Sequence, residues 1–344
     1  MIASALTRSG LRVGLYTSPH LVDVRERMLV DGRPISEDAF AQWTNMLVDE
    51  IERVGASFFE ATTAVAFADF AARGADVAVV EVGLGGRLDS TNVVAPLVSA
   101  VTCVSLEHTD YLGDSIAEIA REKAGIAKAG TPFIIGELDP AVTSVLIERA
   151  DEAGAMVEVV PADSKYPGEL DLHGPHQDRN AAIAAAVLHA LPSELRPCER
   201  EIAEGIASAW LPGRFDCRGK WVFDVAHNPA AIGALVDNLR AAEVDRPIHG
   251  LLGVLNDKDA RYILRVLDLE LDALWVTTPP SAPENRRSDL DALAQLARDN
   301  VVIEPDFARA LAGVQTGAAT VLVTGSFHTV GDAMNRLPGF APLG

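Results

Sequence analysis

The chain has 344 residues, which exceeds the usual size of one hydrophobic core and suits two domains. Its formal net charge of −20 repels phosphate backbones and anionic lipid, so we expect neither nucleic acid nor a membrane as a partner. The three cysteines form no CxxC pair, which argues against a disulfide framework and a thiolate zinc site and fits the cytoplasm. No apolar run reaches about 18 residues, which argues against a membrane-spanning helix.

The elements are expected to alternate between strand and helix along the chain. Residues 1–7 have the pattern of an amphipathic helix, and a strand is expected directly after it. Most later strand-length runs are apolar nearly throughout, which is typical of parallel sheets covered by helices on both faces. The expected strands are 12–16, 77–82, 98–104, 132–136, 221–224, 248–253, 273–277 and 320–324. The expected helices are 36–52, 62–73, 115–127, 141–153, 180–191 and 230–242.

Two segments interrupt this alternation. Residues 162–174 are polar and rich in Pro and Gly, and a second break falls at Leu211-Pro212-Gly213. A complete new α/β series starts just after the second break. We therefore place the domain boundary there and predict domains over 1–211 and 212–344.

Three strands of the first predicted domain end in polar side chains. Ser18 follows the first strand, Glu81 lies in "VAVVEVGLGGRLDSTN", and His108 follows the third. Because ligands bind beyond the carboxyl ends of parallel strands, this hydroxyl, carboxylate and imidazole suit Mg²⁺ or Mn²⁺, with water and phosphate oxygens as further ligands. Taken alone, Ser18 fits a turn and His108 a hydrogen-bonded structural histidine. Glu81 favours function, because a carboxylate buried among valines needs a metal, a cation or a proton.

Other motifs are weaker when each is taken by itself. The spacing of Lys123 among acidic and basic neighbours on an expected helix favours a solvated charge cluster. Three strands of the second domain end in the polar turns "DVAHNP", "NDKD" and "TGSFH", and helix capping explains any one of them. Three such turns at one sheet edge indicate a ligand surface. They contribute Asp224, His227, Asn228, Asp257, Lys258, Asp259, Gly325, Ser326 and His328.

As a set, these motifs resemble those of the folylpolyglutamate synthase/dihydrofolate synthase family, within the wider Mur-ligase group. They follow the family order over essentially the whole chain, and "TSPHL", "EVGLGGRLDSTN" and "HTDYLG…REKAGI" are the most specific. Glu107 departs from the Asp that is more usual in the family. The resemblance implies an α/β protein: a Mur-ligase-like central ATPase domain with a mostly parallel sheet, then a smaller Rossmann-like C-terminal domain.

The resemblance also implies the chemistry. Members of the family use ATP to convert a pteroate or folate carboxylate into an acyl phosphate, which the glutamate amine attacks to give an amide. We therefore expect a cytoplasmic, monomeric acid–amino-acid ligase of folate metabolism that acts on small molecules, with ATP and Mg²⁺ or Mn²⁺ as cofactors. Ser18, Glu81 and His108 match the metal-binding positions, and Lys123 matches a lysine that is carbamylated in the family. The positions that match ATP contacts are Asn180, Arg214, Asp224 and His227.

Lys258, Arg214 and the Arg286-Arg287 pair are the cations that we expect to hold anionic substrates on this acidic protein.

The family has a strand and a GTNGK[ST]-type phosphate loop before the helix that here begins at Met1. No stretch of the 344 residues has the form G-x-x-x-x-G-K-[ST]. We therefore expect such a loop to precede Met1, and we expect the 344 residues alone to have little or no ligase activity. A misplaced start in the gene model and a real short form both explain this, and the other intact motifs favour the first.

Two alternative functions stay open from the sequence. One is another Mur-type amino-acid ligase that acts on a cell-wall precursor, which "TSPHL" and "HTDYLG" oppose. The other is a non-catalytic relative that binds folate or nucleotide, which the missing loop favours and the metal set opposes. Dihydropteroate and folates both stay open as the acceptor.

Overall fold

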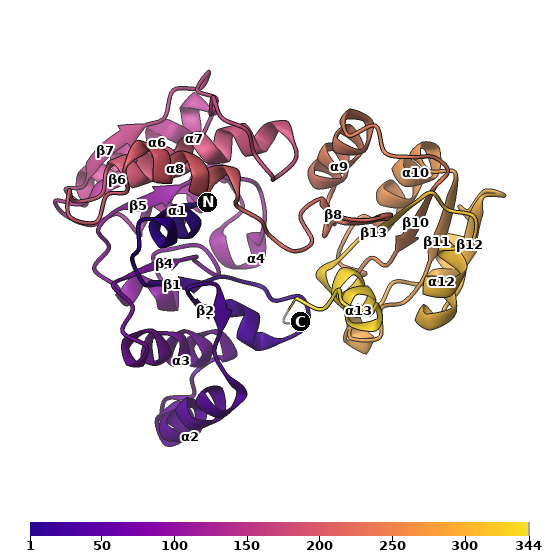
Figure 1. Cartoon of the computed structure of the whole chain (residues 1–344), viewed down its shortest axis with the longest axis horizontal. Coiled ribbons are helices and arrows are strands. Elements are labelled where there is room, and N and C mark those ends of the chain that lie inside the picture. Colours follow the sequence, from indigo (N-terminus) through magenta and orange to yellow (C-terminus); the bar gives the residue numbers. More distant parts are fainter. Residues whose placement is uncertain (343–344) are drawn as a thin grey trace. The chain divides into compact units, whose positions relative to one another are not determined.

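The computed structural model describes residues 1–342, apart from the side chain of Pro175, and they form two compact units (Figure 1). The first unit consists of Met1–Pro19, Val24–Asp171 and Pro175–Ala209. The second consists of His20–Asp23, Leu172–Gly174 and the chain from Trp210 onward. The short segment after Pro19 and the one before Pro175 therefore pack with the C-terminal unit.

The first unit contains two sheets. One has the strand order β3-β2-β1-β4, in which β1 is parallel to β4 and β2 is antiparallel to both of its neighbours. The other has the order β5-β6-β7 and is parallel throughout. Within the described residues, β4 and β5 each have one edge without a partner strand. The strands are β1 (Val13–Tyr16), β2 (Met28–Val30), β3 (Arg33–Pro34), β4 (Val77–Val80), β5 (Ser99–Val101), β6 (Pro132–Ile135) and β7 (Met156–Val159).

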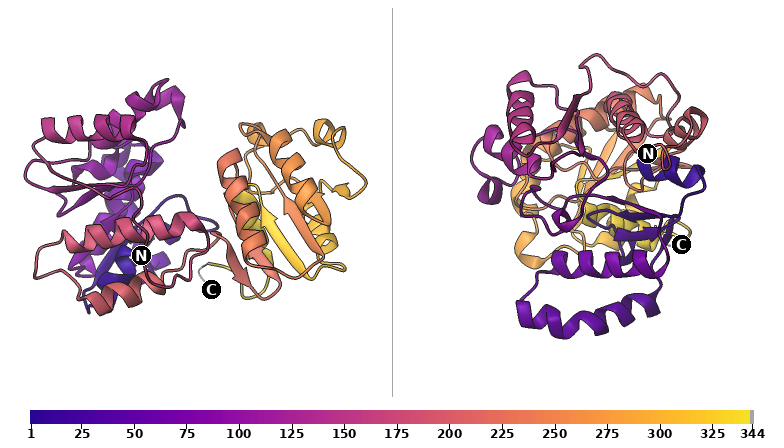
Figure 2. Two further views of the ribbon diagram at one scale, coloured as in Figure 1. Left: turned by 90° about the horizontal axis from the view of Figure 1, so that it is seen from above. Right: turned by 90° about the vertical axis from the view of Figure 1, so that its left-hand side faces the viewer.

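Helices cover both faces of these sheets (Figures 1 and 2). On one face, Leu6 and Leu188 share a buried core with Val13 of β1. On the other, Tyr16 packs with Phe70. The helix that follows β3 lies outside the next one, and none of its residues is buried. The helices are α1 (Ile2–Arg8), α2 (Glu37–Val54), α3 (Phe58–Ala72), α4 (Thr109–Leu112), α5 (Ile116–Ala124), α6 (Pro140–Glu152), α7 (Pro175–His189) and α8 (Glu199–Ala207).

Local capping explains where several of these helices begin. The side chain of Ser57 accepts a hydrogen bond from Glu60 N, and the Glu60 side chain accepts one from Ser57 N, which forms a capping box for α3. Ser115 and Glu118 form the same arrangement at the start of α5. Each box satisfies backbone N–H groups that a helix start otherwise leaves unpaired.

The second unit has one six-stranded sheet with the order β12-β11-β10-β13-β9-β8, parallel except for the antiparallel β8. Helices α9, α10 and α11 cover one face and α12 and α13 the other (Figure 1). The result is a doubly wound, Rossmann-like sheet. Its strands are β8 (Asp216–Arg218), β9 (Trp221–Phe223), β10 (Ile248–Leu252), β11 (Ala273–Val276), β12 (Val301–Ile303) and β13 (Thr320–Thr324). Its helices are α9 (Pro229–Ala241), α10 (Ala260–Glu270), α11 (Leu290–Ala294), α12 (Phe307–Val314) and α13 (Phe327–Arg336).

The valine-rich strand before Glu81 packs on both faces, because Val77 and Val79 contact the core of Leu6 and Leu188 and Val80 contacts the core of Phe70. The expectation that Glu81 is buried there is wrong. Ala78 is exposed, the three valines of β4 are only half-buried, and Glu81 itself is exposed. The physical reason is that β4 is an edge strand of its sheet. Among residues 1–342, no helix is long and apolar enough to cross a membrane.

Candidate active site

The carboxyl ends of β1 and β4 bring Ser18 and Glu81 together. The two strands are parallel with Tyr16 opposite Val80, so the residues that follow them emerge at one edge of the sheet. Glu81 N donates to Tyr16 O at 2.9 Å, and Ser18 N donates to Oε2 of Glu81 at 2.9 Å. The Glu81 carboxylate is therefore held next to Ser18, although it is exposed and not buried as expected.

The chemistry of these donors fits Mg²⁺ or Mn²⁺. Hydroxyl and carboxylate oxygens are the ligands that such hard cations take, and Mg²⁺ usually binds through one or two carboxylates with water and substrate phosphates. In the part of the chain that the structure describes, no group of three or more His, Cys, Asp and Glu residues could hold a metal ion. A cation at Ser18 and Glu81 would thus depend on water and phosphate oxygens for its remaining ligands.

His108, the third predicted metal ligand, lies at the exposed N-cap of α4. Its φ of 56° is in the left-handed region, which costs a residue other than glycine roughly 1–3 kcal/mol. Residues strained in this way tend to cluster at functional sites. Its carbonyl oxygen accepts hydrogen bonds from Tyr111 N and Leu112 N. The role of His108 as a metal ligand stays a prediction.

The glycine-rich loop after β4 packs against the end of α5 that carries Lys123. Arg87 N donates to Glu122 O at 2.9 Å, and the Arg87 guanidinium binds the Glu122 carboxylate at 2.9 Å. A Cβ on Gly86 would lie 2.8 Å from the backbone oxygens of Glu122 and Lys123, so this approach requires glycine. The loop therefore links the end of β4, where Glu81 lies, to helix α5 with Lys123, whose side chain is half-buried.

The predicted ATP contacts belong to two different units. Asn180 lies on α7 in the first unit, where its amide donates to Oε1 of the buried Gln177 at 3.1 Å. Arg214, Asp224 and His227 all belong to the second unit.

Arg214, Asp224 and His227 gather near the start of α13. The Arg214 guanidinium lies 5.5 Å from the ring centroid of Phe327, and the His227 ring lies 6.1 Å from the same centroid. Asp224 accepts hydrogen bonds from Ala226 N at 2.8 Å and Phe215 N at 2.9 Å. Burial raises the pKa of Asp224, while these hydrogen bonds and the charge of Arg214 oppose that rise. Sequence reasoning did not single out Phe327, although it lies within the motif "TGSFH".

A charged cluster follows β10 and β11 in the same unit. A guanidinium nitrogen of Arg286 lies 3.1 and 3.0 Å from the two carboxylate oxygens of Asp257, and Lys258 Nζ lies 3.5 Å from Oδ2. Partial burial would raise the pKa of Asp257, but the hydrogen bonds and charge of Arg286, together with Lys258, hold that pKa below its usual range. Arg287 donates to the carbonyl oxygens of Ala282 at 3.1 Å and Pro280 at 3.4 Å. The expected substrate-binding cations Lys258, Arg286 and Arg287 are thus held at one sheet edge.

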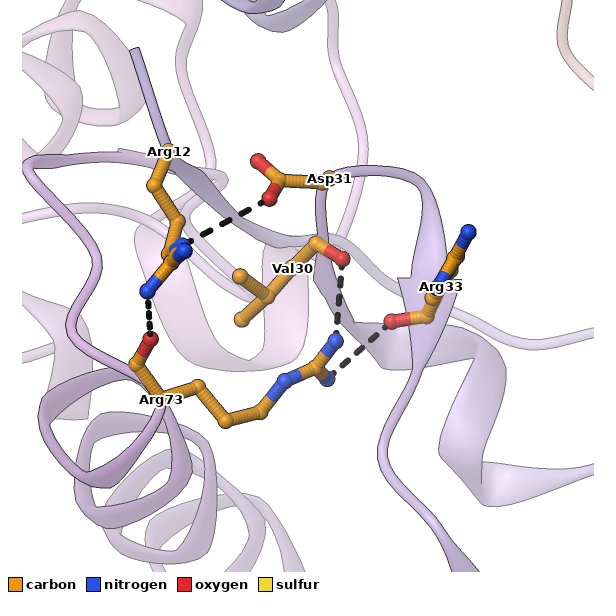
Figure 3. Close-up of a pocket in the computed structure, with 5 residues that line it drawn as sticks. All are labelled: Arg12, Val30, Asp31, Arg33 and Arg73. Atoms are coloured by element: carbon orange, nitrogen blue, oxygen red, sulfur yellow. Dashed lines mark hydrogen bonds and ion pairs between the residues drawn. The ribbon is translucent and has the colours of Figure 1, made fainter.

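A cavity of about 480 Å³ lies elsewhere, at the amino end of β1 (Figure 3). Two of the arginines that line it, Arg12 and Arg73, donate hydrogen bonds to backbone carbonyl oxygens. Arg12 binds the carbonyl oxygen of Arg73 at 3.0 Å, and Arg73 binds those of Val30 at 3.0 Å and Arg33 at 3.1 Å. Asp31 lies 3.7 Å from Arg12. This cavity therefore does not contain the predicted active-site residues.

Comparison with known proteins places this arrangement in a family. Residues 213–327 match the model of the "Mur ligase, glutamate ligase domain". The dihydrofolate synthase/folylpolyglutamate synthase of Escherichia coli is 36% identical over 354 residues, which cover 97% of this chain and 82% of that protein. The chain belongs to the dihydrofolate synthase/folylpolyglutamate synthase family.

Further proteins and solved structures are similar to this chain over nearly its whole length. A probable bifunctional folylpolyglutamate synthase/dihydropteroate synthase of Halobacterium salinarum is 38% identical over 97% of this chain, which spans 44% of that longer protein. The structure of E. coli FolC in complex with DHPP and ADP superposes with a TM-score of 0.85 at 35% identity, covering 97% of this chain and 84% of FolC. A bifunctional synthase solved with Mn, AMPPNP and L-glutamate bound gives a TM-score of 0.82 at 33% identity, over 97% of this chain and 84% of that one.

Proposed function

We propose that this protein is an ATP-dependent ligase that joins L-glutamate to dihydropteroate, to a tetrahydrofolate or to both, through an acyl phosphate. The observation that carries the proposal is the pairing of Ser18 with Glu81 beside the glycine-rich loop. The chain that contains this pair is similar over 97% of its length to the dihydrofolate synthase/folylpolyglutamate synthase of E. coli. The protein acts in the cytoplasm as a monomer on small molecules, which its charge of −20 and three exposed free cysteines support.

The two domains, 1–211 and 212–344, contribute different residues to substrate and cofactor binding. In the first, Ser18, Glu81 and His108 hold the divalent cation, Lys123 supports it as a carbamate, and Asn180 contacts the nucleotide. In the second, Arg214, Asp224 and His227 contact ATP, while Lys258, Arg286 and Arg287 hold carboxylates. Support for this division comes from the clusters described above in each unit and from the glutamate ligase model that matches 213–327.

The reaction needs charge stabilisation more than it needs covalent chemistry by the protein. When bound, Mg²⁺ or Mn²⁺ would neutralise charge on phosphate oxygens as the phosphoryl group leaves ATP for the substrate carboxylate. The Glu81 carboxylate is already positioned by Ser18 N, so little reorganisation is needed when the nucleotide binds. The amine of glutamate then displaces phosphate from the acyl phosphate to form the amide.

A product assay tests this function. The polypeptide is supplied with a phosphate-loop segment in front of Met1, because the 344 residues contain none, and is incubated with Mg·ATP, labelled L-glutamate and dihydropteroate or tetrahydrofolate. We expect labelled amide together with equal amounts of ADP and phosphate. Glu81→Gln should lower kcat about 100-fold, because it removes the charge that holds the cation. Glu158→Gln, at an exposed position of β7, is the matched control and should be silent. Amide formation without ATP, or an unchanged Glu81→Gln enzyme, would contradict the proposal.

A further inference from the structure

Ser281, His328 and Asp332 form a hydrogen-bonded group beside the cationic cluster of the second unit. Ser281 lies in the loop after β11, and the other two residues lie in the first turns of α13. Ser281 Oγ is 2.9 Å from Nδ1 of His328 and 3.0 Å from Oδ2 of Asp332. Ser281 N also donates to Oδ2 of Asp332 at 3.0 Å. Ser281 and Asp332 are not among the residues named above, and His328 was named only as part of the polar turn "TGSFH", without a role.

The geometry fixes the position of the imidazole proton. An ionised carboxylate only accepts, so the single hydroxyl hydrogen of Ser281 is donated to Asp332. Ser281 Oγ must then accept from His328, which means that Nδ1 carries the ring proton. In the neutral ring, Nε2 is consequently left with a free lone pair.

Burial of the ring favours this neutral form. Burial lowers the pKa of His328 more than the carboxylate of Asp332 raises it, and the charge of Arg286 lowers it slightly further. Arg286 comes from the segment η3 (Glu284–Arg286) and is paired with Asp257, which also contacts Lys258. Asp332 also forms an ion pair with Arg336 at 3.4 Å, which weakens its pull on the imidazole proton.

The surrounding charges complement an amino acid with an acidic side chain. Such a molecule carries two carboxylates and one ammonium group. Lys258, Arg286 and Arg287 lie on the loops after β10 and β11 and suit the carboxylates. An ammonium group instead needs an acceptor that is not a cation, and the neutral Nε2 of His328 provides one.

We propose that Nε2 of His328 receives a proton from the amino group of the incoming glutamate, and that Asp332 and Ser281 hold the imidazole in the tautomer that makes this transfer possible. This inference rests on the proposed ligase function. His328 would contact the substrate directly, whereas Ser281 and Asp332 are positioning residues that act through it.

The proton and bond balance of the step is complete. Glutamate arrives with an ammonium group, and one of its protons passes to Nε2, which turns His328 into an imidazolium. The freed lone pair forms a bond to the carbonyl carbon of the acyl phosphate, and the bond from that carbon to the phosphate oxygen breaks with its electron pair on phosphate. A second nitrogen proton leaves with the phosphate as the amide forms. His328 then returns its proton to water.

Nitrogen NMR on the 344-residue chain tests the inference without requiring turnover. The protein is labelled with ¹⁵N-histidine, and loss of one of the eight histidine signals in His328→Gln assigns the resonance. We expect the Nδ1–H tautomer for His328 and a mixture of tautomers in Ser281→Ala. L-glutamate should shift the Nε2 resonance, whereas glutarate, which has both carboxylates but no amino group, should not. An Nε2–H tautomer in the wild type, or equal responses to glutamate and glutarate, would overturn the inference.

Kinetics in the ligase assay provide the second test. His328→Gln should lower kcat about 100-fold and Ser281→Ala about 10-fold, with the KM for ATP unchanged, as for loss of a general base. The wild-type kcat/KM for glutamate should fall at acid pH as His328 becomes protonated, and this limb should be absent in His328→Gln. His249→Gln is the matched control, because His249 in β10 bonds only the carbonyl oxygen of Val314 in the described chain, at 3.0 Å. An unchanged kcat in His328→Gln would overturn the inference. If the wild type forms no amide, the proposed function fails. The NMR comparison of glutamate with glutarate then shows separately whether Nε2 of His328 contacts an amino group.

Discussion

Replacing Gly86 with alanine tests how the glycine-rich loop is held against α5. The new Cβ would lie 2.8 Å from the carbonyl oxygens of Glu122 and Lys123 and 3.0 Å from a methyl carbon of Ile126. Contacts of this kind are normally about 3.5 Å or longer, and two of the three neighbours are backbone atoms that cannot rotate away. The loop must therefore move off the helix, which weakens the 2.9 Å hydrogen bond from Arg87 N to Glu122 O.

Overpacking of this kind costs about 1–3 kcal/mol, and one hydrogen bond adds about 1 kcal/mol when it is lost. Together these costs amount to about 2–4 kcal/mol, so we expect Gly86→Ala to lower the calorimetric midpoint by about 4–16 °C, at roughly 2–4 °C per kcal/mol for a domain of this size. Gly233→Ala is the control, because a Cβ there meets nothing within 4 Å on helix α9, and alanine should stabilise that helix by about 0.5–1 kcal/mol. The reasoning is refuted if Gly86→Ala melts like the wild type or if both substitutions destabilise equally.

Three further predictions concern charge, modification and the phosphate loop. Because burial raises the folded-state pKa of Asp224, its ionised carboxylate destabilises the fold at neutral pH, and this penalty disappears as the pH falls through the raised pKa. Asp224→Asn should therefore gain stability relative to the wild type as the pH rises from about 4 to 7; urea unfolding that shows the opposite trend would refute this. ¹³C-bicarbonate should produce a carbamate signal in the wild type but not in Lys123→Arg, and a signal in both would rule out Lys123 as the modified residue. The 344 residues alone should form amide at least 100-fold more slowly than the same residues preceded by a phosphate-loop segment, and equal rates would contradict that expectation.

The sequence was sufficient to predict the strands with continuous apolar runs. The expected strand over 320–324 coincides with β13, and that over 273–277 contains β11. Short or polar strands gave no such signal. β3 has two residues, one of them proline, and β8 consists of Asp, Cys and Arg, so their pairing depends on neighbouring strands and not on their own composition.

Residues of the candidate site could be placed from the sequence only where they directly follow parallel strands, because such residues emerge at the same edge of the sheet. Parallel strands place Ser18 and Glu81 at one edge, so their proximity follows from the pattern of the strands. The burial of Glu81 did not follow, because a run of valines does not reveal that its strand lies at a sheet edge. Ser281 and His328 are 47 residues apart, and only the packing of the loop after β11 against α13 brings them into contact. Nothing in the sequence "TTPPSAPENRRS" indicates that partner.

Mn²⁺ titration followed by electron paramagnetic resonance tests the central claim, that Ser18 and Glu81 hold a divalent cation against a nucleotide. It is done with AMPPNP present on the polypeptide that carries an added phosphate-loop segment. We expect one Mn²⁺ per chain. The affinity for Mn²⁺ should be weaker by about 10-fold or more in both Ser18→Ala and Glu81→Gln, and unchanged in Glu158→Gln. Equal Mn²⁺ affinity in the wild type and in Glu81→Gln would contradict the account.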